Sequence, residues 1–80
     1  MNALKTKVEQ SLARLGLPNA GIRVVLDDAG NVIATVASTS FDGVEESVRQ
    51  TQVWRRLRAD LSADELVRVE FVFTRDSAGN

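Results

Sequence analysis

The feature that most constrains the fold is a pair of short apolar segments separated by a polar stretch. Ile22, Val24 and Leu26 recur at every second position, a pattern typical of a half-buried β-strand. Residues 32–38, VIATVAS, form a second segment that is rich in β-branched side chains. The intervening sequence DDAGN, residues 27–31, contains turn-forming residues and a glycine suited to positive φ. Together the three segments predict a β-hairpin, around which the other elements must be arranged.

Helical periodicity precedes this hairpin. Leu4, Val8, Leu12 and Leu15 recur at spacings of four, four and three residues, which places them on one stripe of an α-helix. The sequence GLP that follows, residues 16–18, contains a residue tolerant of positive φ and a proline that cannot continue a helix. We therefore expect the first helix to end there.

A second helix is expected over residues 44–61, after the hairpin. Its apolar residues cover one broad arc of the helical wheel, with charged and polar residues opposite. Asp42 and Glu45 have the spacing of a capping box at its start. Ser62 and Glu65 repeat that spacing and predict a short helical turn. The apolar members of the arc are Val44, Val48, Val53, Trp54, Leu57 and Leu61.

The last strand pattern, in the sequence LVRVEFVFT at residues 66–74, has one strongly apolar side. The opposite side is mixed and contains Arg68, Glu70, Val72 and Thr74. We expect the apolar side to face the core, where it would join the stripes of the two helices. That side consists of Val67, Val69, Phe71 and Phe73.

The order helix, strand, strand, helix, short helix, strand predicts an α+β fold of two layers. A crossover from the hairpin into the last strand, with both helices on one face of a three-stranded mixed sheet, buries all the apolar stripes at once. With 80 residues, the chain is expected to form a single domain over 1–80. Residues 1–2 and 75–80 are expected to be disordered.

The chain contains no cysteine and no histidine, which excludes disulfides, thiol nucleophiles and the usual zinc sites. Ser38, Ser40 and Ser47 therefore have no histidine to act as their base. The acidic pairs adjoin turns or helix starts, where water keeps pKa values ordinary. Asp27 and Asp28 could be imagined as metal ligands, but beside a glycine turn we interpret them as solvated turn residues. We expect a protein that is not an enzyme and that uses no metal and no cofactor.

The net charge is −1, so no overall field attracts nucleic acid or an anionic membrane. The first residues, MNALKTKVEQ, lack the apolar core of a signal peptide. No stretch approaches the roughly 18 apolar residues of a membrane helix. We expect a cytoplasmic protein that makes no membrane contact.

Two residues of the second helix have two interpretations each. Trp54 lies in the apolar arc and is either a core anchor or an interface hot spot. Gln50 falls within the same arc, so its amide either hydrogen-bonds a backbone group or lies at the surface.

The sequence from the end of the hairpin to the last strand resembles the BolA family over residues 38–74, about half the chain. Members of that family show a serine or similar residue, a Phe-x-Gly, a basic residue with His or Gln, a Val-aromatic pair, a leucine, and a strand that opens with Ile/Val-His-Ala. The matching residues here are Ser38, Phe41-Asp42-Gly43, Arg49-Gln50, Val53-Trp54, Leu57 and Leu61, followed by the strand LVRVEFVFT.

The resemblance implies a class II KH-like fold of α-β-β-α-(α)-β order and a regulatory role in the cytoplasm. BolA proteins pair with monothiol glutaredoxins around an iron–sulfur cluster, act in iron and stress physiology, and in some cases regulate transcription by binding DNA. The histidine that ligates the cluster at the start of the family's last strand falls at Val67 here, or at Arg68, and the ligand in the hairpin loop falls near Asn31. The histidine that some members carry after the basic residue is Gln50 here. Valine cannot ligate iron and asparagine is a poor cluster ligand. We therefore expect a partner to bind without a cluster.

The leading hypothesis is a non-enzymatic, BolA-like adaptor that binds a protein partner such as a monothiol glutaredoxin. Its candidate contact residues are Phe41, Arg49, Gln50, Arg68 and Glu70.

The alternative is a nucleic-acid-binding module of KH-like order that uses arginines of the second helix. These arginines diverge on the helical wheel, and no two glycines have the spacing of a KH clamp, so an ion-paired helix face is the competing interpretation. A third hypothesis is self-association through a free sheet edge, which would give a monomer or weak dimer. The arginines are Arg49, Arg55, Arg56 and Arg58.

Overall fold

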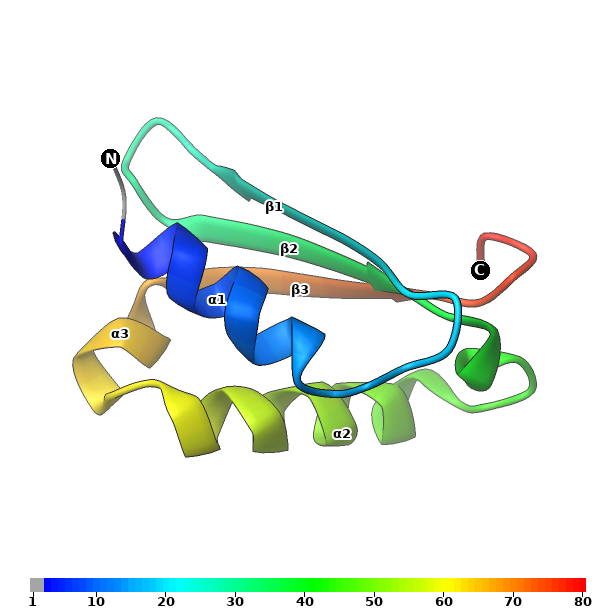
Figure 1. Ribbon diagram of the computed structural model, residues 1–80. Coiled ribbons are helices and arrows are strands. Elements are labelled where there is room, and N and C mark those ends of the chain that lie inside the picture. Colours follow the sequence, from blue (N-terminus) through cyan, green and yellow to red (C-terminus); the bar gives the residue numbers. More distant parts are fainter. Residues whose placement is uncertain (1–2) are drawn as a thin grey trace.

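A three-stranded mixed sheet with strand order β1-β2-β3 forms one layer of the molecule (Figure 1). β1 (Gly21–Leu26) pairs antiparallel with β2 (Val32–Ala37), and β3 (Val69–Arg75) pairs parallel with β2. In the computed structural model, which describes residues 3–80, the expected α+β fold is confirmed. The predicted disorder of residues 1–2 lies outside the described residues.

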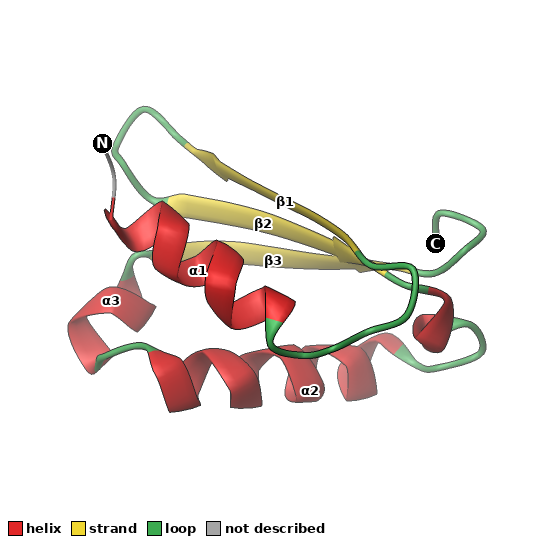
Figure 2. Ribbon diagram, in the orientation of Figure 1, coloured by secondary structure: helices red, strands yellow, loops and turns green. Residues whose placement is uncertain are grey.

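Helices form the second layer and cover one face of the sheet (Figure 2). We call this the inner face and the opposite one the outer face. The helices are α1 (Ala3–Ala13), α2 (Glu46–Asp60), the short α3 (Ala63–Val67) and a 3-10 turn, η1 (Thr39–Phe41).

α1 buries Leu4, Val8 and Leu12 against the sheet and α2, as their spacing predicts. Beyond α1, Gly16 adopts φ of 63°. That left-handed conformation favours glycine and turns the chain away from the helix axis. The predicted end of the first helix is therefore confirmed.

The β1–β2 turn is held by the side chain of Asp27. Its Oδ1 accepts hydrogen bonds from the backbone N–H groups of Ala29 (2.9 Å) and Asn31 (2.8 Å). Gly30 adopts φ of 80°, so the glycine of DDAGN has the conformation that the sequence predicts. Asp27 is thus a turn residue that satisfies backbone donors.

The start of α2 differs from the prediction. The helix begins at Glu46, and its N-cap residue, Glu45, makes no capping hydrogen bond through its side chain. The carboxylate of Asp42 points elsewhere and accepts hydrogen bonds from the N–H (2.7 Å) and hydroxyl (2.6 Å) of Ser77. The predicted capping box of Asp42 and Glu45 is wrong, because Asp42 caps the end of η1 and a turn at Gly43 (φ 73°) separates it from α2.

The second predicted capping box is confirmed at the start of α3. The hydroxyl of Ser62 accepts from the N–H of Glu65 (3.2 Å), and the carboxylate of Glu65 accepts from the N–H of Ser62 (2.8 Å). Lys7 on α1 donates to the same carboxylate (2.7 Å), which ties α3 to α1.

β3 contains a bulge that changes which of its side chains are buried. Val32 pairs with Val69, but the next residue of β2, Ile33, pairs with Phe71, so Glu70 is an extra residue. A bulge of this kind shifts the alternation of the side chains that follow it. Val72 and Thr74 therefore face the helices, and the expectation that the phenylalanines face the core is wrong. Phe71 is 51% exposed and Phe73 44%, while Val67 belongs to α3 and is 84% exposed.

One apolar core lies between the helices and the inner face. α2 contributes less to it than predicted, because Val44 precedes the helix and Val48 faces solvent with 54% of its surface exposed. Trp54 is half-buried at the margin of the core. The buried apolar residues are Leu4, Val8, Leu12, Val24, Val32, Ala34, Val36, Phe41, Val53, Leu57, Leu61, Val69 and Val72.

Candidate functional site

Two of the residues expected to contact a partner are buried. Phe41 is 1% exposed and Arg49 is 6% exposed. The guanidinium of Arg49 donates to the carbonyl oxygens of Val44 (2.8 Å), Phe41 (3.0 Å) and Asn80 (2.8 Å), and it lies 5.6 Å from the centre of the Phe41 ring. Arg49 therefore holds the loop before α2 and the end of the chain together, and neither residue presents a surface to a partner.

The segment after β3, expected to be disordered, instead contacts this arginine and Asp42, the residue that follows η1. Asp76 lies 3.6 Å from the guanidinium of Arg49. The hydrogen bond from the Ser77 hydroxyl lowers the pKa of Asp42, with help from the Ser77 N–H. These contacts were missed because their partners are far apart in the sequence and obey no helical or strand period.

Gln50 connects α2 to β3. Its Nε2 donates to the carbonyl of Val72 (2.7 Å) and to Glu46 (2.9 Å), and its Oε1 accepts from the indole N–H of Trp54 (3.0 Å). Of the two interpretations of Gln50, the one in which it hydrogen-bonds a backbone group is confirmed. The hydrogen bonds of its amide are all made within the fold, and they connect the helical layer to the sheet.

The other two expected contact residues are exposed and lie where the β1–β2 turn meets the start of β3. Arg68 donates from Nη2 to the carbonyl of Gly30 (2.9 Å), and Asn31 donates from Nδ2 to the carboxylate of Glu70 (3.3 Å). Val67 precedes them with 84% of its surface exposed. We call Gly30, Asn31, Val67, Arg68 and Glu70 the hairpin-end surface.

A pair of acids gives this surface its electrostatic character. A hydrogen bond with Asp27, followed by desolvation and the negative charge of Asp27, raises the pKa of Glu70. The pKa of Asp27 is lowered, first by the N–H of Asn31 and then by Glu70. The two carboxyl groups thus differ in acidity, and Glu70 takes up a proton before Asp27 as the pH falls.

Among residues 3–80, no group of three or more His, Cys, Asp or Glu side chains is arranged to hold a metal ion. Within the same range, no helix is both long and apolar enough to cross a membrane.

The α2 arginines are in three different environments. Arg49 is buried, and Arg56 pairs with Asp60 on the same helix at 3.0 Å. Arg55 and Arg58 are exposed and form no ion pair with any residue that the structure describes. The four arginines therefore do not form one basic surface.

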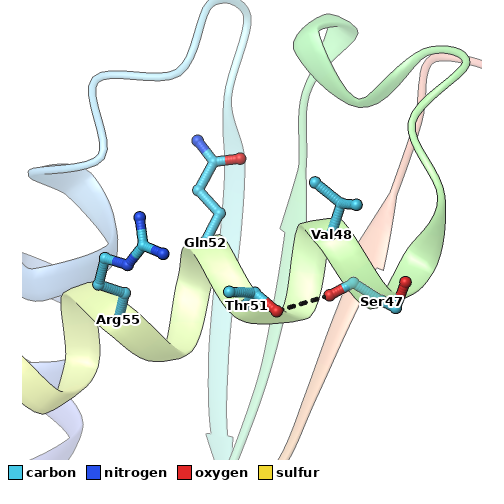
Figure 3. A pocket seen from close by; sticks show the side chains of 5 residues that line it. All are labelled: Ser47, Val48, Thr51, Gln52 and Arg55. Atoms are coloured by element: carbon cyan, nitrogen blue, oxygen red, sulfur yellow. Dashed lines mark hydrogen bonds between the residues drawn. The ribbon is translucent and has the colours of Figure 1, made fainter.

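Arg55 also lines a shallow hollow on the solvent side of α2 (Figure 3). Within it, the hydroxyl of Thr51 donates to the carbonyl of Ser47 (2.9 Å). Because all its lining residues belong to one helix, the hollow lacks an opposite wall to enclose a ligand. They are Ser47, Val48, Thr51, Gln52 and Arg55.

A second surface that the sequence did not predict is the outer face of the sheet. Phe71 and Phe73 stack there with their ring centres 5.9 Å apart, and Val25, across β2 on the same face, is 40% exposed. The phenylalanines reach this face because of the bulge at Glu70. No residue type in the last strand predicts that bulge from the sequence.

Comparison of the chain with protein-family models, with curated proteins and with solved structures finds no match.

Proposed function

We propose that this chain is a non-enzymatic adaptor domain that binds a protein partner through the hairpin-end surface. The observation that carries this proposal is the hydrogen bond from Arg68 to Gly30, which joins segments 38 positions apart in the sequence into one exposed surface. Val67, which directly precedes Arg68 in the chain, has 84% of its surface exposed.

The chemistry of this surface suits a protein partner. Exposed apolar side chains surrounded by charged ones are typical of interfaces, where the apolar group is buried on binding and the charges form a polar rim. Val67 is the apolar group, and Arg68 and Glu70 are the charged neighbours. The Asn31 amide, which bonds Glu70, adds a polar group that a partner backbone can meet.

The BolA resemblance suggests a monothiol glutaredoxin as the partner and iron or stress regulation as the setting. The positions that the family uses for cluster ligands, Val67 or Arg68 and Asn31, belong to the hairpin-end surface. Neither valine nor asparagine provides a good cluster ligand, so the partner would bind through apolar and polar contacts without sharing a cluster.

NMR titration tests this function. Isotope-labelled protein is mixed with a monothiol glutaredoxin, with and without its cluster, and the amide signals are followed. We expect shifts concentrated at residues 30–31 and 67–70, equal in both samples. Val67→Asp should abolish them, whereas Val48→Asp, at an exposed valine of α2, should leave them unchanged. Absence of shifts, or shifts confined to α2, would contradict the proposal.

Nucleic-acid binding is a second candidate because Arg55 and Arg58 are exposed and unpaired among the described residues. Binding of this kind weakens steeply as salt is added, since phosphate contacts release counterions. Replacing both arginines by alanine should reduce the salt slope by about two, while Arg56→Ala should change it less because Arg56 is already paired. If no binding to RNA or DNA is detected at low salt, this candidate is rejected.

A further inference from the structure

The outer face of the sheet has a regular arrangement of residues, and none of the helices within residues 3–80 covers it (Figure 2). Strand pairing places Val25, Ile33 and Phe71 side by side in one row across β1, β2 and β3. The next row contains Arg23, Thr35 and Phe73, and the third contains Gly21, Ala37 and Arg75. These residues are exposed or partly exposed, whereas those between them are buried, apart from the partly buried Ile22.

Opposite charges lie at opposite ends of this face. Beyond the Phe71 row, Asn31 continues β2 and hydrogen-bonds Glu70, whose carboxyl group adjoins that of Asp27. Arg23 and Arg75 lie in the second and third rows. The face therefore has an acidic end, an apolar middle and a basic end.

We propose that two copies of this chain pack outer face against outer face, related by a two-fold axis that runs across the strands between the Phe71 and Phe73 rows. This axis places Phe71 of each copy against Phe73 of the other. It also places Glu70 of each copy opposite Arg75 of the other, one row further out. The interface is isologous, so each favourable pair occurs twice.

The charge pattern favours a second copy over a nucleic acid. The face carries two acids and two arginines, so a phosphate backbone would meet repulsion from Asp27 and Glu70 along half its length. A second copy in this orientation places Glu70 opposite Arg75 in both halves of the interface. A two-fold axis along the strands would instead place the acidic end of one copy on the acidic end of the other. Repulsion between like charges disfavours that arrangement.

The small area of the outer face limits how tightly two copies can associate. Three strands about 4.8 Å apart and rows about 7 Å apart give an area on the order of 300 Å² in plan. Two copies would bury on the order of 600 Å² in total, less than the roughly 1,200 Å² of a stable interface. The dimer is therefore weak, with a dissociation constant on the order of 100 μM.

Sedimentation velocity over about 20 μM to about 1 mM tests the proposal. Wild-type protein should change from monomer to mostly dimer across this range. The double variant Phe71→Thr, Phe73→Thr keeps strand-forming residues and should associate at least about tenfold more weakly. Val48→Thr, at an exposed valine outside the face, is the matched control and should behave as wild type. Far-UV circular dichroism checks that each variant folds.

Charge reversal tests the orientation of the two copies. Glu70→Arg and Arg75→Glu should each weaken association about threefold to tenfold, because each leaves like charges opposed. Their combination should restore the wild-type dissociation constant to within about twofold, since the pair is re-formed with signs exchanged. If the face bound an unrelated protein instead, combining the two charge reversals would not restore that binding.

Three results would overturn the proposal. The first is a monomer at every concentration, and the second is a dimer that survives the double phenylalanine substitution. The third is a shift of the Phe71 and Phe73 signals on addition of a short oligothymidine at low salt, which would assign the face to single-stranded nucleic acid. Glu70 and Asn31 belong to both surfaces, whereas Val67 belongs to the hairpin-end surface alone, so the glutaredoxin titration with Val67→Asp tests the adaptor function separately.

Discussion

The two faces of the sheet carry similar side chains in opposite environments. On the inner face Val36 is fully buried and Val72 is 7% exposed. On the outer face Val25 is 40% exposed and Phe71 51%. Neighbouring residues of the same strand thus belong to the core or to solvent according to which face they point to. The helices decide which face is the core, and the bulge at Glu70 decides which residues of β3 reach it.

The largest expected effect comes from placing a charge on each face. Val36→Lys puts an unpaired ammonium group into the core and should lower the free energy of unfolding by more than about 4 kcal/mol. Val25→Lys places the same group in solvent and should lower it by less than about 1 kcal/mol. Urea denaturation followed by circular dichroism measures both. Equal losses would mean that the outer face is also covered.

Arg49 and Arg58 lie on the same helix, but one is buried and the other is exposed. Arg49→Met leaves three backbone carbonyls without their donor and should lower the free energy of unfolding by about 3 kcal/mol. Arg58→Met removes an exposed charge and should change it by less than about 0.5 kcal/mol. Thermal unfolding of the two variants measures the difference, and an Arg49→Met protein as stable as wild type would show that the arginine is not structural.

Deletion of Glu70 tests the bulge. Without the extra residue, Val69 and Phe71 still pair with Val32 and Ile33, and the strand becomes regular. We expect a folded protein that loses no more than about 1 kcal/mol, with both phenylalanines still exposed. The contrary case is a regular β3 in which both phenylalanines face the core. Deletion of Glu70 would then turn them to solvent, and the protein would unfold.

The smallest effects are the pH dependences of two acids. The pKa of Asp60 is lowered from 3.8, first by the hydroxyl of Ser11 and then by Arg56, so its stabilising contribution exists above that value and is lost as the pH falls through the lowered pKa. The pKa of Glu70 is raised, so its stabilising contribution is present at low pH and is lost as the pH rises through the raised pKa. Asp60→Asn should therefore be less stable than wild type at pH 7, with a gap that closes in acid. Glu70→Gln should be at least as stable as wild type at pH 7. Melting temperatures measured between about pH 3 and pH 7 test both signs, and a reversed sign for either variant would contradict the pKa shift of that residue.

Most of the fold could be predicted because its elements follow simple periods. The stripe of Leu4, Val8 and Leu12, the DDAGN turn and the capping box of Ser62 and Glu65 are local patterns with local causes. The buried side of β3 could not be predicted, because a single extra residue reverses the alternation without changing the composition.

The candidate site was predicted less well, because burial depends on contacts between distant segments. Arg49 looks like a surface arginine in sequence, yet three carbonyls, one from Asn80, make its burial favourable. Gln50 bonds a carbonyl of β3 that is remote in the chain. Arg68 and Glu70 are exposed, as a partner-binding role requires, and the turn residues beside them complete a surface that no local motif describes.

The bulge in β3 turns Phe71 and Phe73 to the open face of the sheet. The most direct measurement is the NMR relaxation of their ring protons in the presence of a soluble paramagnetic agent, with Phe41 as the buried reference. We predict strong enhancement for Phe71 and Phe73 in dilute solution, none for Phe41, and a decline for the first two as the protein concentration rises. Protection of all three rings at every dilution would contradict the account.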